Sequence, residues 1–271
     1  MTVVERGSSH IQYQNEVLQE EHQIWGIPYR PIDPRICEKE VAEYLECDYI
    51  TIQSSFAMRS FIEKGVPAKK LIKLPLSVDL KMFHPVKKRD SVFRVLYIGS
   101  MSLRKGVPYL LKAISSLQLP NFEFVVNGTV YPGCEKIVQK YASNIRFLGT
   151  RPFNQLYDVY SQASVVVLPT IEDGFAKVIT EAMACGVPVI VTPNCSASDV
   201  LTDGVEGFIV PIRSSEAIRE RILLLYENPN LRNAMAEAAL IRSQAGGGWT
   251  SYGERAYEIY SEKRKEHLGG Q

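Results

Sequence analysis

The sequence predicts an α/β fold in which a doubly wound parallel sheet is covered by helices on both faces. From about residue 95 onward, short runs rich in Val and Ile alternate with helical segments. The runs are apolar on successive residues, which is typical of strands buried on both faces. Such a sheet binds its ligands at the carboxyl ends of its strands. The six runs are VLYIG (95–99), FEFVVNG (122–128), IRFLG (145–149), SVVVLPT (164–170), PVIVT (188–192) and GFIVP (207–211).

Amphipathic helices are expected between these runs. In residues 106–117 and again in residues 216–226, the apolar side chains fall on one helical face. The first 88 residues differ, because only two strand-like runs occur there, YITIQ (49–53) and KLIKL (70–74), separated by a helix that begins near Ser54 or Ser55. Two strands rarely form a stable sheet alone, so exposed strand edges are expected in this part.

Proline and glycine mark the boundaries between parts of the chain. The segment 75–91 contains two prolines and a charge run and reads as a connector, and the break SQAGGGW (243–249) precedes a last amphipathic segment. We therefore divide the chain into residues 1–88, residues 89–245 with the six-stranded sheet, and a closing helix over residues 246–271.

Composition excludes several classes of protein. The 271 residues carry 31 basic and 30 acidic side chains, so nothing in the net charge of +1 favours nucleic-acid binding. Five cysteines without close paired spacing fit buried thiols in a reducing compartment better than disulfides or a zinc site. No apolar run reaches bilayer-spanning length, and the start of the chain lacks a signal-peptide core. We expect a soluble cytoplasmic protein, with a basic tail, EKRKEH, that permits peripheral membrane attachment.

An acidic pair follows the fourth predicted strand. Asp173 lies on the loop, and Glu181 lies eight residues later in a helix that is expected to open around Phe175. Eight residues of helix return to nearly the same face, so both carboxylates can face one cleft, beside N–H groups that attract anions. This arrangement suits a ligand with phosphate and hydroxyl groups. The simpler alternative is that Asp173 caps the helix and Glu181 is a solvated surface charge.

A cationic loop, GSMSLRKG (99–106), follows the first strand of the sheet. Gly99 frees the turn, and Arg104 and Lys105 precede a helix with Pro108 in its first turn. Two cations at such a junction can neutralise a diphosphate without a metal. A solvated basic pair is the alternative reading.

The ordered set of motifs resembles the retaining, metal-independent glycosyltransferases of GT-B fold, the group 1 or family 4 type. The resemblance covers residues 38 to 262. It is carried by EKGVPAKKLIKLPLSVDLKMFHP, GSMSLRKGVPYLLKAI, the acid-x7-acid segment, ACGVPVIVT and SDVLTDGVEGFIVP. It implies a Rossmann-like donor domain with the remnant of a second Rossmann-like domain. The implied reaction is retaining transfer of a hexose from a UDP- or GDP-linked sugar to an acceptor, saccharide or lipid-linked among the options. No cofactor or metal is implied, and the chain contains no Asp-x-Asp.

The resemblance also assigns roles to residues. Glu181 would bind the ribose hydroxyls, Asp173 the donor sugar and Lys105 the diphosphate, with Asp173 and Lys105 as the catalytic pair. Backbone around residues 150–152 would contact the base. The complete expected donor site is Gly99, Ser100, Arg104, Lys105, Arg151, Asp173, Gly174, Phe175, Ala176 and Glu181.

Three departures from the family pattern leave alternatives open. The leading acid is usually glutamate, so Glu172 competes with Asp173 for the sugar contact. Ser100 stands where arginine is common, and Arg104 is the candidate to compensate. The first 88 residues match only the end of the family's N-terminal domain, so a non-catalytic or partner-dependent module is the alternative to an enzyme. An epimerase or a phosphorylase of the same fold is a third reading without a supporting motif. Structural roles are expected for His84 and His267, and none is assigned to His10 or His22.

Overall fold

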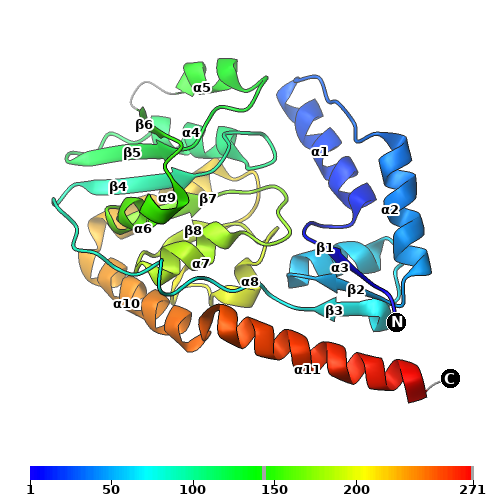
Figure 1. Ribbon diagram of the computed structural model, residues 1–271. Helices are drawn as coiled ribbons and strands as arrows, with labels where there is room; N and C mark the ends of the chain where they lie inside the picture. Colours follow the sequence, from blue (N-terminus) through cyan, green and yellow to red (C-terminus); the bar gives the residue numbers. More distant parts are fainter. Residues whose placement is uncertain (142–144, 270–271) are drawn as a thin grey trace.

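The computed structural model describes residues 1–141 and 145–269, which form two parallel sheets lying side by side (Figure 1). The larger sheet has six strands in the order β6-β5-β4-β7-β8-β9. This order confirms the doubly wound fold and all six predicted runs. The strands are β4 (Phe93–Ile98), β5 (Phe122–Asn127), β6 (Ile145–Gly149), β7 (Val165–Leu168), β8 (Val189–Val191) and β9 (Gly207–Ile209).

Helices cover both faces of the larger sheet. On one face, α4 packs against α5 and α9, and on the other α7 packs against α6, α8 and α10. The two predicted amphipathic helices, α4 and α9, are confirmed, and their apolar side chains are buried. The helices are α4 (Val107–Ser115), α5 (Glu135–Tyr141), α6 (Leu156–Ser161), α7 (Lys177–Ala184), α8 (Ala197–Val200), α9 (Ser215–Glu227) and α10 (Pro229–Ala245), and one 3-10 turn, η2 (Phe153–Gln155), precedes α6.

The smaller sheet has three strands, in the order β1-β2-β3. The expectation of two strands in this part of the chain was wrong, because Val3–Arg6 pairs with the central strand as a third. This strand lies at the sheet edge with alternate residues exposed, so it lacks the continuous apolar run that marks the others. The elements of this part are β1 (Val3–Arg6), α1 (Ile11–Trp25), α2 (Pro34–Glu46), β2 (Tyr49–Ile52), α3 (Ser55–Glu63), η1 (Ala68–Lys70) and β3 (Leu71–Lys73). Ser54 caps α3 through its side chain, so the helix begins at Ser55, one of the two expected starts.

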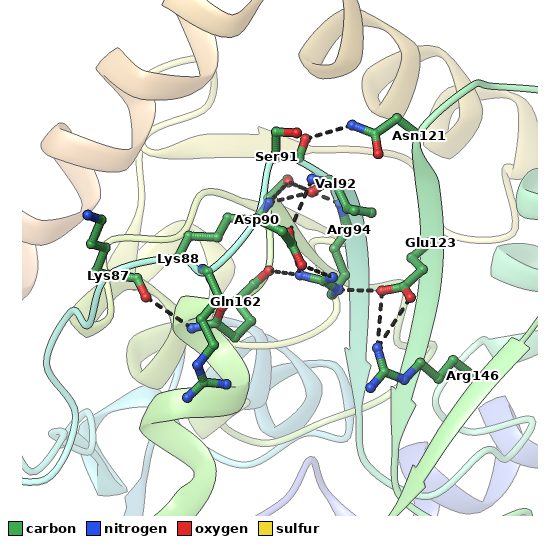
Figure 2. A network of polar contacts seen from close by, with 12 residues as sticks. Lys87, Lys88, Asp90, Ser91, Val92, Arg94, Asn121, Glu123, Arg146 and Gln162 are labelled. Carbon is green, nitrogen blue, oxygen red and sulfur yellow. Dashed lines mark hydrogen bonds and ion pairs between the residues drawn. The ribbon is translucent and has the colours of Figure 1, made fainter.

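The connector between the sheets is fastened to the amino-terminal edge of the larger one (Figure 2). Arg94 on β4 has only 9% of its side chain exposed, and its guanidinium binds Asp90 of the connector at 2.9 Å and Glu123 of β5 at 2.6 Å. The same guanidinium donates to the carbonyl of Gln162 at 2.6 Å. Lys88 donates to two further oxygens nearby, and burial lowers the pKa of its ammonium group to about 8. These charges hold the connector in place and lie at the sheet edge away from the carboxyl ends of the strands.

The last helix, α11 (Gly248–Gly269), runs from the larger part of the molecule along the smaller sheet (Figure 1). It begins within the predicted glycine break, where Gly247 and Gly248 have φ of 72° and 69°. The Tyr260 hydroxyl of α11 lies 2.9 Å from the Thr51 hydroxyl of β2. Within the described residues, no helix is both long and apolar enough to cross a bilayer. The five cysteines of the described chain are free thiols, four of them buried.

Candidate functional site

The cationic loop (residues 99–106) and the loop after β7 (residues 169–176, here the acid loop) lie against each other at the carboxyl ends of β4 and β7. These two strands are neighbours in the sheet, so the topology brings the loops together. The carbonyl of Arg104 accepts a hydrogen bond from the N–H of Ile171 at 2.9 Å. Gly106 has a φ of 65°, and a Cβ there would lie 1.8 Å from the carbonyl oxygen of Pro169. Only glycine permits this close contact.

Two ion pairs join the side chains of these loops. The Arg104 guanidinium contacts the Glu172 carboxylate at 2.8 Å, and the Lys105 ammonium group contacts the Asp173 carboxylate. The two carboxylates differ in exposure, because Glu172 is fully buried whereas Asp173 keeps 15% of its side chain exposed; the cations keep 38% for Arg104 and 21% for Lys105. The alternative in which Arg104 and Lys105 form a merely solvated basic pair does not describe this arrangement. Asp173 does not cap α7 either, because Ala176 holds the N-cap position.

Glu172 also binds the segment that precedes α1. Its carboxylate accepts hydrogen bonds from Ser8 Oγ at 2.9 Å, Ser9 Oγ at 2.8 Å and Gln14 Nε2 at 2.8 Å. Burial alone would raise the pKa of Glu172, but the Arg104 guanidinium and these donors outweigh it, so the pKa lies below its ordinary value. Glu172 is therefore an ionised carboxylate whose partners are all supplied by the protein.

The backbone of the serine loop, which comprises Gly7, Ser8 and Ser9, packs directly on Gly174. A Cβ at Gly174 would lie 2.2 Å from the carbonyl oxygen of Gly7, so a side chain there would force the two loops apart. This wall of the site was not predicted from the sequence. Its only signal is the run GSS between the short strand VVER and an amphipathic helix, a strand–loop–helix unit that is easily read as a disordered start.

The C-terminal end of α1 is held at a second point. Arg213, in the loop after β9, contacts Glu20 at 2.8 Å and the fully buried Glu21 at 2.8 Å. Trp25 Nε1 donates to Glu21 at 3.0 Å and to the Tyr109 hydroxyl of α4 at 3.2 Å. Helix α1 therefore lies across the carboxyl-end loops of the larger sheet and closes one side of the site.

Glu181 lies in α7 with only 7% of the residue exposed, so it is not the solvated surface charge of the simpler reading. Its carboxylate accepts a hydrogen bond from the Tyr160 hydroxyl at 2.7 Å, and burial raises its pKa. In the described chain, no contact joins this carboxylate to Asp173. The helix begins at Lys177, two residues later than expected, and Phe175 and Ala176 belong to the loop before it.

The remaining predicted site residues lie at the same sheet edge. Gly99 has a φ of 133°, and the Ser100 carbonyl accepts a hydrogen bond from the Tyr97 hydroxyl at 2.7 Å. Arg151, after β6, is exposed, and its N–H donates to the Asn127 side chain at 3.2 Å. The structure therefore brings Arg104, Lys105, Glu172, Asp173 and Gly174 together, with these groups around them.

The histidines take no part in this cluster. His10 directly follows the serine loop, but its ring packs against Tyr44 and Phe61 with centroids 5.0 Å apart in each case. Burial, with the charges of Lys64 and Arg6, lowers the pKa of His10 to about 4, so its ring is neutral at pH 7. His84 stacks on Tyr157, and the ring of His267 lies 3.7 Å from Asp48. Among residues 1–141 and 145–269, no group of three or more His, Cys, Asp or Glu side chains is placed to hold a metal.

Comparison with known proteins identifies relatives of the same architecture. D-inositol 3-phosphate glycosyltransferase of Kribbella flavida is 35% identical over 207 residues, which are 68% of this chain and 48% of that protein. Sucrose-phosphate synthase of Thermosynechococcus elongatus superposes with a TM-score of 0.79 at 24% identity, covering 97% of this chain and 68% of that one. Anabaena HepE in complex with UDP-glucose superposes with a TM-score of 0.71 at 18% identity, covering 80% of this chain and 64% of that one. The two superpositions show the shared GT-B fold.

The family assignment rests on the sequence match to the family as a whole. The chain spans between 40% and 62% of the length of the curated relatives that it matches. The family described as "Glycosyl transferases group 1" matches residues 80–242, from the connector through most of α10, which is more than half of the chain. The chain therefore belongs to the group 1 glycosyltransferases.

Proposed function

We propose that this chain binds a nucleoside diphosphate sugar at the carboxyl ends of β4 and β7 and takes part in transferring its hexose to an acceptor. One observation carries the proposal: the cationic loop and the acid loop meet side chain to side chain through Arg104–Glu172 and Lys105–Asp173. A cation for the diphosphate and a carboxylate for the sugar hydroxyls then lie next to each other, as a sugar diphosphate requires.

Different side chains are proposed to bind different parts of the donor. Lys105 is the cation available for the diphosphate because its partner Asp173 is partly exposed, whereas Arg104 is bound by the buried Glu172 and by Ser8 Oγ. Asp173 is the acid available for the sugar, because Glu172 has all its partners within the protein. We therefore propose Asp173, rather than Glu172, as the acid that contacts the sugar. Glu181 is proposed to bind the ribose hydroxyls.

The proposed reaction is a retaining transfer that needs no metal. The bond between the anomeric carbon and the diphosphate oxygen breaks, and the diphosphate leaves with both electrons. The oxygen of the acceptor hydroxyl attacks the same face of the sugar, and its proton passes to the departing diphosphate oxygen. Lys105 and the backbone N–H groups near Gly174 and Phe175 would stabilise the charge on the departing diphosphate. Positioned charges of this kind lower a barrier because they need no rearrangement as the charge develops.

A UDP-linked hexose is the first donor to test. Anabaena HepE was solved with UDP-glucose bound, and its chain superposes on four fifths of this one. The exposed Arg151 and the backbone beside it, at the end of β6, are proposed to lie next to the base. GDP-linked sugars are the second choice, and the acceptor is a saccharide or a lipid-linked molecule in this proposal.

A second candidate function is donor binding without turnover, completed by another polypeptide. It is favoured by the open edge of the smaller sheet. The smaller sheet has only three strands, and the strand β1 at its edge is half exposed. An edge of this kind is a ready site for further strand pairing.

The two candidates are separated by measuring binding and turnover on the same sample. The purified chain is titrated with UDP and GDP by calorimetry and then incubated with UDP-glucose or GDP-mannose while released nucleoside diphosphate is measured. Release by the chain alone supports the enzyme and rules out the module. Binding without release supports the module. A chain that neither binds nor releases either nucleotide would contradict both.

A further inference from the structure

The two loops of the proposed donor site carry equal and opposite charges. Each cation of the cationic loop faces one carboxylate of the acid loop, Arg104 with Glu172 and Lys105 with Asp173. A diphosphate is strongly anionic, and it gains little from cations that are already neutralised. Its binding therefore requires one of the two ion pairs to open.

The Lys105–Asp173 pair is the easier one to open. Both its members keep part of their side chains in water, and among the described residues Lys105 is the only side chain that donates to the Asp173 carboxylate. Glu172 is fully buried and accepts hydrogen bonds from the serine loop and from Gln14 in addition to Arg104. Opening the Lys105–Asp173 pair therefore costs less than opening the Arg104–Glu172 pair, because the latter would leave the fully buried Glu172 carboxylate without its counter-charge.

Opening this pair releases two groups of opposite chemistry. Lys105 becomes free to bind phosphate, and Asp173 becomes free to accept hydrogen bonds from hydroxyls. An intact sugar nucleotide satisfies both groups. The nucleoside diphosphate left after transfer satisfies only Lys105, and it leaves the Asp173 carboxylate beside a phosphate of like charge.

We propose that Asp173 distinguishes the intact donor from the spent diphosphate by competing with the diphosphate for Lys105. The inference rests on the proposed function and adds a specificity-determining role to Asp173. In the empty site the Asp173 carboxylate is paired with Lys105. The hydroxyl groups of a bound sugar displace the carboxylate from the lysine. After transfer, the carboxylate returns to Lys105 and weakens the hold on the product. Release of the nucleoside diphosphate is thereby favoured over its retention.

The test is calorimetric titration of Asp173→Asn with UDP and GDP. The asparagine is nearly the same size and cannot compete for the lysine as an anion. We expect the nucleotide that the unaltered chain binds to bind about fivefold more tightly, the factor that corresponds to one partly exposed ion pair. The affinity for UDP-glucose or GDP-mannose should rise less than that for the diphosphate, so the preference for intact donor falls. A residue with a merely structural role would weaken both.

A second background shows whether the competition is for Lys105. Lys105→Gln removes the cation, so adding Asp173→Asn to it should bring no further gain in affinity. An equal gain with and without Lys105 would mean general charge repulsion and would overturn the proposal. Glu123→Gln is the matched control, because it removes a carboxylate from an ion pair near the amino end of β5, and it should leave affinity unchanged.

The outcomes separate this inference from the function on which it rests. If the unaltered chain binds UDP or GDP and a folded Asp173→Asn variant binds it equally or less tightly, the inference is wrong and the proposed function stands. If the unaltered chain binds neither nucleotide, both are wrong. A gain in Glu123→Gln as large as that in Asp173→Asn would also overturn the inference, since net charge alone would then explain it.

Discussion

Glu181 is a carboxyl group buried between α6 and α7, with the Tyr160 hydroxyl as its hydrogen-bond donor. Burial raises its pKa because the charged form loses its hydration. A raised pKa means that the folded state binds the proton more tightly than the unfolded state does, so this group costs stability as pH rises above the ordinary pKa. Such a cost is expected of a residue retained for binding rather than for the fold.

We predict that Glu181→Gln raises thermal stability and weakens nucleotide binding in the same protein. The amide oxygen can still accept from Tyr160, and glutamine has no charge to desolvate. In thermal melts the variant should gain a few degrees at most near neutral pH, and the gain should vanish as the pH falls to the ordinary glutamate pKa of 4.5. Calorimetry should show weaker binding of UDP or GDP by about tenfold, as for a lost hydrogen bond to a charged group.

Either half of this result can fail by itself. Unchanged nucleotide affinity would remove Glu181 from the proposed ribose site. A stability gain that does not depend on pH would show that something other than the carboxylate's titration is responsible.

Helix α1 and the serine loop before it close one side of the site. The serine loop binds Glu172, and the far end of α1 binds Arg213 and Tyr109. Gly174 sits where the serine loop meets the acid loop, with no room for a Cβ beside Gly7. The contact is between backbones, so rotating a side chain cannot relieve a clash there.

We predict that Gly174→Ala separates the serine loop from the acid loop. The added methyl group would approach the Gly7 carbonyl oxygen to 2.2 Å, so one loop must move, at a cost of about 1–3 kcal/mol in the free energy of unfolding. Hydrogen exchange should become faster at the amides of Ser9 and its neighbours. Gly253→Ala is the control, because nothing lies within 4 Å of its Cβ position in α11, and alanine should stabilise the helix slightly. Equal exchange at Ser9 in both variants would contradict the predicted clash.

Side-chain contacts, as well as the connector, join the two sheets. Asp199 of α8, in the larger part, has 4% of its side chain exposed and accepts from the Ser55 N–H at 2.7 Å and from Lys73 at 2.8 Å, both in the smaller part. The acceptor therefore sits at the N-terminus of α3, where a carboxylate is favourable. This contact and those of Glu172, Arg213 and Tyr260 fix the smaller sheet against the larger one.

We predict that Asp199→Ala lowers the free energy of unfolding by about 1–3 kcal/mol, because the N–H and the hydroxyl of Ser55 lose their buried acceptor and the half-exposed Lys73 loses its partner. Urea denaturation followed by circular dichroism measures the change. Asp158→Ala removes an ion pair in which Arg89 is largely exposed, and it should change stability by at most about 0.5 kcal/mol. If the two variants lose stability equally, Asp199 is not a link between the two parts.

The larger sheet could be predicted because a parallel strand that is buried on both faces has a continuous apolar run in the sequence. Runs such as 164–170 and 188–192 are apolar throughout, and the residues that follow them must lie at one sheet edge. The pairing of Lys105 with Asp173 and the burial of Glu172 could not be predicted in this way. They depend on contacts across more than sixty residues, from Arg104 to Glu172, and on the serine loop from the far end of the chain.

The short strand β1 and the start of α7 were misjudged for local reasons. Val3–Arg6 holds only two apolar residues at an edge, so nothing in its composition distinguishes it from a loop. Phe175 and Ala176 are helix-compatible residues, but Gly174 is held by the serine loop, and the helix begins only at Lys177. In both cases a tertiary contact decided the local structure.

The position of α11 has a consequence for synthesis of the protein. This helix contacts β2 through Tyr260 and Thr51, yet the ribosome makes it some two hundred residues after that strand. The smaller sheet therefore leaves the exit tunnel before the helix that lies along it. It lacks that helix until the larger sheet has been synthesised. The contact between α11 and β2 can therefore form only after the whole of the larger sheet has been made.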